Sequence, residues 1–175
     1  MRTIVLQICL AALFGIPAFT TAGYCLPDAG SAPHSHVDRV LVYKSKRLME
    51  LRNGSEVIRS YRVALGRNPV GRKVRAGDCR TPEGIYRLDR RSAASRFYRS
   101  IHISYPNAAD RAAARKLGVA PGGDIMIHGL PKGFEDLEEW HVITDWTKGC
   151  IAVTNAEISE VWRLVPDGTP IEIKP

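Results

Sequence analysis

The sequence has few aromatic residues, few cysteines and no internal repeat. Phenylalanine, tryptophan and tyrosine make up 7% of the 175 residues, and there are four cysteines. The chain is long enough to bury an ordinary core in one domain without relying on disulfide bonds. Because 45% of the residues are hydrophobic and 25% are charged, the composition also excludes a disordered chain.

Long apolar runs are absent after the first twenty residues. Ile4–Phe19 is almost continuously apolar and follows the single charge of Arg2, a pattern typical of a secretory signal peptide. A retained membrane anchor is the alternative, although the run is broken by polar and helix-breaking residues and is short for a span of about 20 residues. We therefore expect an exported, periplasmic or wall-associated protein, divided into a signal peptide at 1–22, a linker at 23–36 and a domain at 37–175.

The cysteine count is odd once the signal peptide is removed. Cys25, Cys79 and Cys150 remain, so an oxidising compartment leaves at least one thiol unpaired or bonded to another molecule. Cys25 and Cys79 form one candidate disulfide, which would leave Cys150 free.

Acidic residues are scarce between positions 39 and 99. This region has 17 basic and 5 acidic side chains within a net charge of +7 for the chain. Nucleic-acid binding is not favoured, because only Tyr61 offers an aromatic ring for stacking among these charges. A solvated surface and a docking face for an anionic cell-envelope polymer both remain open.

Short strand patterns dominate the expected domain. Asn53-Gly54 predicts a two-residue hairpin, and Thr154 with Glu157 predicts a capping box that opens a helix. The sequence therefore favours a mainly β sandwich or barrel-like domain with two or three short helices. Expected strands are Arg39–Tyr43, Lys46–Arg52, Glu56–Ala64, Gly84–Asp89, Ser100–Ser104, Asp124–His128, Cys150–Val153 and Thr169–Ile173; expected helices are Asn107–Leu117, Gly133–Trp140 and Glu157–Leu164.

Two residues carry the chemistry we expect. His128 ends an apolar strand before Gly129, and Cys150 follows Gly149 at the start of another strand. A thiol becomes a good nucleophile near neutral pH when a histidine accepts its proton, which is what acyl transfer through a thioester requires. A structural role in the core is the alternative for each residue alone, and His141 is a competing base.

These residues resemble a known family, the L,D-transpeptidase catalytic domain, also called the YkuD domain. The resemblance rests on Ile127-His128-Gly129, on Thr147-Lys148-Gly149-Cys150-Ile151 with Asn155 beyond it, on Arg80-Thr81-Pro82-Glu83-Gly84 and on the closing segment Asp167–Ile173. It implies a mainly β sandwich built on a mixed sheet. It also implies attack of a thiolate on a tetrapeptide stem of peptidoglycan, release of D-Ala, and transfer of the acyl group to form a 3→3 cross-link.

The resemblance also assigns roles to individual residues. Cys150 is the expected nucleophile and His128 the general base and acid, with Gly129 orienting the imidazole and the backbone around Gly149 lining an oxyanion hole. No metal or organic cofactor is implied. The arginine common two residues after the cysteine is Ala152 here. Arg80 and Lys148 are therefore candidate substrate-binding residues, together with Trp146.

Several functions share these residues. The acceptor of the acyl group decides the activity: an amine makes the protein a transpeptidase, and water makes it an L,D-carboxypeptidase or amidase. A wall-linked lipoprotein is a further candidate partner. A wall-binding module without catalysis is the alternative from another class. The segment Phe134–Trp146 forms either a lid over the cleft or a surface helix.

Overall fold

Strands dominate the part of the chain that the computed structural model describes, which is residues 36–93, 96–134, 136 and 140–175. The expected signal peptide and nearly all of the expected linker lie outside these residues. Cys25 lies outside them too, so its pairing with Cys79 stays a prediction. No helix of the described part is both long and apolar enough to cross a membrane.

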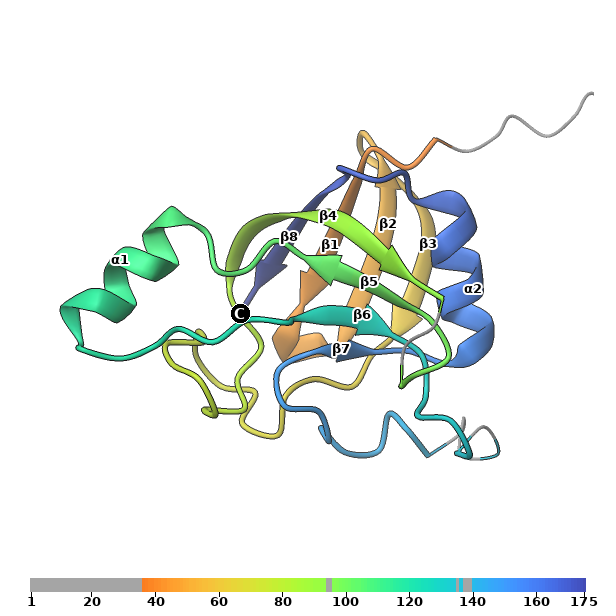
Figure 1. The fold of residues 1–175 in the computed structure, drawn as a ribbon. Coiled ribbons are helices and arrows are strands. Elements are labelled where there is room, and N and C mark those ends of the chain that lie inside the picture. Colours follow the sequence, from red (N-terminus) through yellow and green to blue (C-terminus); the bar gives the residue numbers. More distant parts are fainter. Residues whose placement is uncertain (1–35, 94–95, 135, 137–139) are drawn as a thin grey trace, which may run out of the picture. The chain divides into compact units, whose positions relative to one another are not determined.

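Eight strands form one mixed sheet in the order β3-β2-β1-β8-β4-β5-β6-β7 (Figure 1). The β1–β8 and β6–β7 pairs are parallel and the other neighbours are antiparallel. The elements are β1 (Arg39–Tyr43), the 3₁₀ turn η1 (Lys44–Lys46), β2 (Leu48–Asn53), β3 (Glu56–Arg62), β4 (Gly84–Ser92), β5 (Ser100–Ile103), α1 (Ala108–Lys116), β6 (Met126–His128), β7 (Ile151–Ala152), α2 (Asn155–Leu164) and β8 (Pro170–Lys174).

The centre of the sheet joins the first and last strands of the described chain. Val40 of β1 pairs with Ile171 of β8, and Ile171 pairs on its other side with Tyr86 of β4. Buried residues alternate with more exposed ones along β8 and β4, so one face of these strands packs on the core. In β1, three consecutive apolar residues are buried, namely Val40, Leu41 and Val42.

The sheet curls until its two edges approach each other. Just beyond β3, Ala64 exchanges two backbone hydrogen bonds with Ala152 of β7, at 3.0 and 2.8 Å. The apolar core includes fully buried side chains from β2, β5 and β6, such as Met49, Ile101 and Ile127. This closure brings the end of β3 next to the segment that carries Cys150.

Helix α2 packs its apolar face into this core. Thr154 caps it by accepting a hydrogen bond from the backbone of Glu157, whose carboxylate accepts one from the backbone of Thr154 in return. This capping box satisfies two amides at the helix start. Ile158 and Val161 are fully buried beneath the helix, so α2 is held mainly by apolar burial.

Most expected elements are confirmed, with shifted ends. The Asn53-Gly54 hairpin is present, with Asn53 paired to Glu56 across it. β2 begins later than expected because η1 occupies Lys44–Lys46, β3 ends at Arg62, and β4 continues through Ser92. Residues 135 and 137–139 of the expected helix Gly133–Trp140 lie outside the described part. The expected mainly β architecture with a mixed sheet and two helices is confirmed.

Candidate active site

His128 is the last residue of β6 and lies deep in the fold. Its side chain is buried, and its imidazole stacks on Phe97 with ring centroids 3.8 Å apart and planes 18° from parallel. The edge of Trp146 lies against it with centroids 5.6 Å apart. Its Nδ1 is 2.7 Å from the Gly129 carbonyl oxygen. A carbonyl only accepts hydrogen bonds, so Nδ1 carries the proton in the neutral ring and Nε2 is the free base.

Burial keeps this imidazole neutral. It lowers the pKa of His128 to about 4, with a smaller contribution from the positive charge of Arg96, while the hydrogen bond to Gly129 opposes the shift. The neutral ring is the form that can accept a proton. At neutral pH, His128 is therefore unprotonated at Nε2.

Gly129 and Asn155 lock the position of the histidine. A Cβ on Gly129 would lie 2.5 Å from Oδ1 of Asn155, so only glycine fits without rearrangement. The same Oδ1 accepts a hydrogen bond from the Leu130 backbone at 2.9 Å. The first residue of α2 thus fixes the turn that follows β6. Gly129 contacts the imidazole through its carbonyl oxygen, and its role in orienting the ring stays a prediction.

Cys150 directly precedes β7, the parallel neighbour of β6. His128 pairs with Ala152 and Ile127 with Ile151, so continuing the register places Cys150 beside Met126. Alternate residues of a strand share a face, which puts Cys150 and His128 on the same face, two positions apart along the strands. Topology therefore brings together the two residues singled out from the sequence.

The thiol of Cys150 is protonated at rest. Its Sγ lies 3.6 Å from the carbonyl oxygen of Asp124 and donates to it, rather than to His128. Burial raises the pKa of Cys150, and the negative charge of Asp124 raises it further. A backbone hydrogen bond from Met126 and the charge of Lys73 act in the opposite direction. Forming the thiolate therefore requires a base.

The polar groups of the turn before Cys150 hydrogen-bond to one another. Thr147 Oγ1 donates to the Cys150 carbonyl oxygen at 2.8 Å and accepts from the Gly149 N–H at 3.0 Å. Gly149 has a φ of +131°, and a Cβ there would lie 2.7 Å from the Arg80 carbonyl oxygen. The glycine is required for this close approach. Because its N–H is bonded to Thr147, it does not supply the expected oxyanion contact in this conformation.

A cavity of about 690 Å³ opens beside the thiol. Phe97 and Trp146 line it and also contact the His128 ring, so the imidazole lies directly behind two of its walls. The sequence did not single out Phe97 or Arg96, because both stand in a loop without a motif. The lining residues are Arg96, Phe97, Gly123, Asp124, Ile125, Met126, Trp146, Thr147, Lys148 and Cys150.

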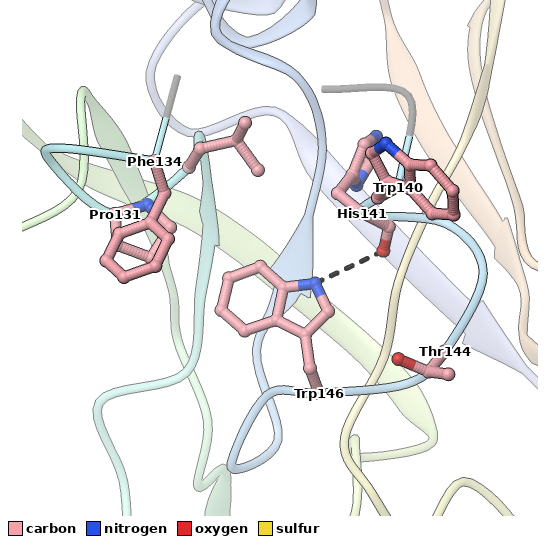
Figure 2. Close-up of a pocket in the computed structure, with 7 residues that line it drawn as sticks. Pro131, Phe134, Trp140, His141, Thr144 and Trp146 are labelled. Atoms are coloured by element: carbon pink, nitrogen blue, oxygen red, sulfur yellow. Dashed lines mark hydrogen bonds between the residues drawn. The ribbon is translucent and has the colours of Figure 1, made fainter. Parts of the chain in front are cut away.

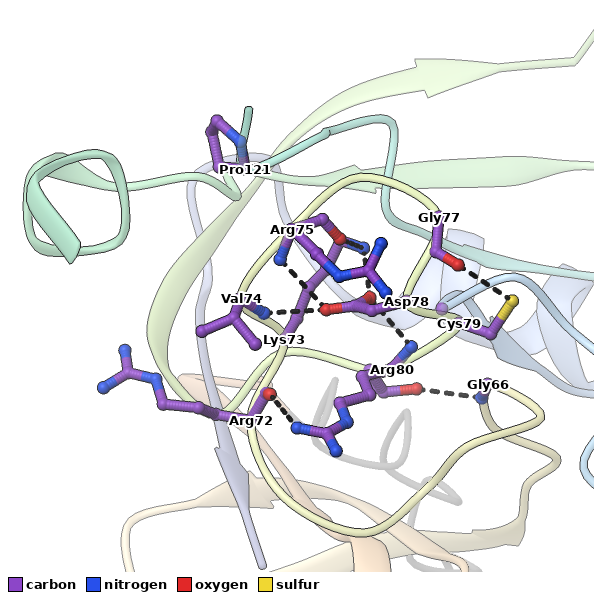
Figure 3. Close-up of polar contacts among 12 residues, drawn as sticks. Gly66, Arg72, Lys73, Val74, Arg75, Gly77, Asp78, Cys79, Arg80 and Pro121 are labelled. Carbon is purple, nitrogen blue, oxygen red and sulfur yellow. Dashed lines mark hydrogen bonds and ion pairs between the residues drawn. The ribbon is translucent and has the colours of Figure 1, made fainter. Parts of the chain in front are cut away.

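Arg80, one of the three expected substrate-binding residues, points away from this cavity. The Arg80 guanidinium donates to the Arg72 carbonyl oxygen at 3.4 Å (Figure 3). Arg80 is not among the residues that line the Cys150 cavity. Lys148 and Trp146 do line it, so the structure brings two of the three candidates to the thiol.

The remaining expected residues have other surroundings. His141 lines a separate apolar pocket of about 290 Å³, where its carbonyl oxygen accepts a hydrogen bond from Trp146 at 3.2 Å (Figure 2). This places His141 away from the thiol and weakens its case as the base. Elsewhere, Nδ1 of His102 in β5 lies 2.6 Å from Oδ1 of Asp89. Neither Cys79 nor Cys150 forms a disulfide within the described part of the chain.

Comparison with known proteins agrees with this mainly β fold. The family model of the L,D-transpeptidase catalytic domain, YkuD, matches residues 37–173. The chain belongs to this family.

Individual relatives are longer than this chain. It is 28% identical to "Putative L,D-transpeptidase YafK" of Escherichia coli (strain K12) over 180 residues, covering 94% of this chain and 64% of the relative. Among solved structures, the helical cell shape determining protein Pgp2 of Campylobacter jejuni is similar with a TM-score of 0.62 and 25% identity, covering 79% of this chain and 48% of that one. Bd1075 of Bdellovibrio bacteriovorus matches with a TM-score of 0.55, 27% identity and the same two coverages.

Proposed function

We propose that this chain is an exported peptidoglycan L,D-transpeptidase, in which Cys150 transfers the acyl group of a tetrapeptide stem through a thioester. One observation carries the proposal above all. A protonated thiol that lines the cavity and a neutral imidazole that packs behind two of its walls lie on the same face of adjacent strands. Membership of the L,D-transpeptidase family supplies the substrate class.

The first half of the reaction forms the thioester. Rotation about the Cα–Cβ bond of Cys150 carries Sγ from the Asp124 carbonyl toward Nε2 of His128, which takes the proton. The thiolate attacks the carbonyl carbon between the third residue and the terminal D-Ala. His128 then gives the proton to the leaving amine, D-Ala departs, and the acyl group remains on Sγ.

The second half of the reaction regenerates the thiol. An acceptor amine from a neighbouring stem loses a proton to His128 and attacks the thioester, and the proton returns to Sγ as the amide forms. We assign stabilisation of the tetrahedral oxyanion to the N–H of Cys150 itself, because the Gly149 N–H is committed to Thr147. Phe97 and Trp146 keep water from the imidazole.

The cellular setting follows from the same proposal. The apolar N-terminal segment supports export, and the chain would then act in the periplasm or at the wall. A wall-linked lipoprotein is a second acceptor class. Pgp2 is described as determining helical cell shape, which supports a role in cell-wall shape for this chain as well.

The test is mass spectrometry of tetrapeptide muropeptides incubated with the purified protein. We expect loss of D-Ala and a new dimer linked between third residues, and we expect neither from the Cys150→Ala and His128→Gln variants. His102→Gln is the matched control, because this histidine of β5 pairs with Asp89 and should leave turnover unchanged. Release of D-Ala that gives only monomeric tripeptide would replace the transpeptidase with a carboxypeptidase. No turnover would refute the tetrapeptide donor.

A further inference from the structure

A second cavity, of about 470 Å³, adjoins the cavity of Cys150 and is lined by three basic side chains. We call it the basic cavity. It shares Gly123 and Lys148 with the cavity of Cys150, so the two form adjoining spaces on either side of these residues. Its lining residues are Arg67, Lys73, Ala76, Gly77, Cys79, Gly122, Gly123 and Lys148.

Two of the cations lining the basic cavity have no acidic partner. Arg67 and Lys148 are exposed, and no ion pair joins either to a carboxylate within the described part of the chain. The Arg67 guanidinium lies 3.8 Å from the sulfur of Cys79. None of the lining residues is acidic. The cavity therefore offers two uncompensated positive charges to an anion.

Lys73, the third cation that lines the basic cavity, stabilises the loop that forms one of its walls. The ammonium of Lys73 donates to Asp78 at 2.8 Å and to the Arg75 carbonyl oxygen at 3.0 Å (Figure 3). Asp78 also accepts from three backbone N–H groups, those of Val74, Arg75 and Arg80. Burial alone would raise the pKa of Asp78, but these hydrogen bonds lower it to about 2. The carboxylate is thus fully occupied and does not neutralise the cavity.

The two walls of the basic cavity contact each other directly. The Ala76 N–H donates to the Ala120 carbonyl oxygen at 2.8 Å. Gly122 has a φ of +81°, and a Cβ there would lie 3.1 Å from the Ala76 Cα. Beside it, a Cβ on Gly123 would meet nothing within 4 Å. The cavity is therefore preformed, with open space beside Gly123, where it adjoins the cavity of Cys150.

We propose that the basic cavity binds the terminal carboxylate of the donor stem, through Arg67 and Lys148. This inference rests on the proposed function. Only one nitrogen and one α-carbon separate the carbonyl carbon attacked by Cys150 from that carboxylate, so the carboxylate must lie in a space that adjoins the thiol. The position two residues after the cysteine, where family members commonly have arginine, is the buried Ala152, and Arg80 points away. Arg67 and Lys148 supply the charge instead.

The test compares two tetrapeptide stems, one with a free terminal carboxylate and one with a terminal carboxamide. We expect the wild type to favour the carboxylate donor in kcat/KM by well over tenfold. Arg67→Ala and Lys148→Ala should each reduce this preference by roughly tenfold, and the double variant should abolish it. Arg62→Ala removes an exposed arginine of β3 that lines neither cavity, and it should retain the wild-type preference.

Two outcomes would overturn the inference. One is a preference for the carboxylate donor that survives in the double variant. The other is a wild type that turns over both donors with the same kcat/KM. A third stem, amidated at a side-chain carboxylate, tests whether the basic cavity binds that carboxylate instead of the terminal one. If the variants change only the preference between the side-chain carboxylate and its amide, the assignment to the terminal carboxylate is wrong.

Binding separates this inference from the proposed function. Calorimetric titration of the Cys150→Ala variant with the two stems needs no turnover. A carboxylate preference in that background, lost when Arg67 and Lys148 are replaced as well, would support the basic cavity even if the wild type turned over neither stem. In that case only the proposed function would fail.

Discussion

The burial of His128 makes a specific prediction about stability and pH. The pKa of His128 is about 4 in the folded protein, against 6.5 for an ordinary histidine. Between these values the unfolded chain binds the proton and the folded chain does not, so the free energy of unfolding falls as the pH is lowered through this range. Above about pH 6.5 the contribution is complete.

The size of the effect follows from the two pKa values. Protonation of the unfolded chain should lower the free energy of unfolding by about 2 kcal/mol at pH 5 and by about 3 kcal/mol at pH 4, relative to neutral pH. Asp78 and Glu160 also have lowered pKa values, but from the lower starting values of 3.8 and 4.5. Their contributions are lost mainly in more acidic solution.

Urea unfolding of the wild type and of His128→Gln, measured from about pH 7 to pH 4, isolates the histidine. The variant also loses the stacking on Phe97, but that loss is the same at every pH and cancels in the comparison of slopes. We expect the wild type to lose about 3 kcal/mol more than the variant over this range. Equal pH dependence of the two proteins would refute the claim that burial keeps the imidazole neutral.

Two further substitutions test the packing around Gly149 and Asp78. Gly149→Ala should lower the free energy of unfolding by roughly 3 kcal/mol in thermal unfolding, because its Cβ meets the Arg80 carbonyl oxygen. Gly54→Ala is the control, because Gly54 has a positive φ but open space around it; it should cost only about 1 kcal/mol. Equal losses in these two variants would contradict the steric argument. Asp78→Asn should lower the free energy of unfolding in urea by about 3 kcal/mol, because it leaves the buried ammonium of Lys73 without a counter-charge. A loss below about 1 kcal/mol would show that the ion pair is dispensable.

Local signals in the sequence predicted the local structure well. The Asn53-Gly54 hairpin and the Thr154 capping box depend on residues close in sequence, so their patterns specify them directly. The pairing of β1 with β8 has no such signal, because it joins residues about 130 positions apart and depends on the packing of the whole sheet.

The same contrast between local signals and long-range contacts separates the site residues that the sequence predicted from those that it missed. Cys150 and His128 could be singled out because each residue type, next to glycine, points to one chemistry. Phe97 gave no signal, since its role comes from stacking on a ring 31 positions away. Arg80 illustrates the opposite error. Its charge suggested substrate binding, but a side chain's direction depends on its neighbours, and here the Arg72 carbonyl oxygen holds it.

The place of β8 at the middle of the sheet has a consequence for how the domain assembles. β1 is made early and β8 last, yet β8 lies between β1 and β4. Until β8 arrives, the strands made earlier form two incomplete sheets with open edges, and open edges invite pairing with other chains. The core is therefore completed only when β8 has been made and has inserted between β1 and β4.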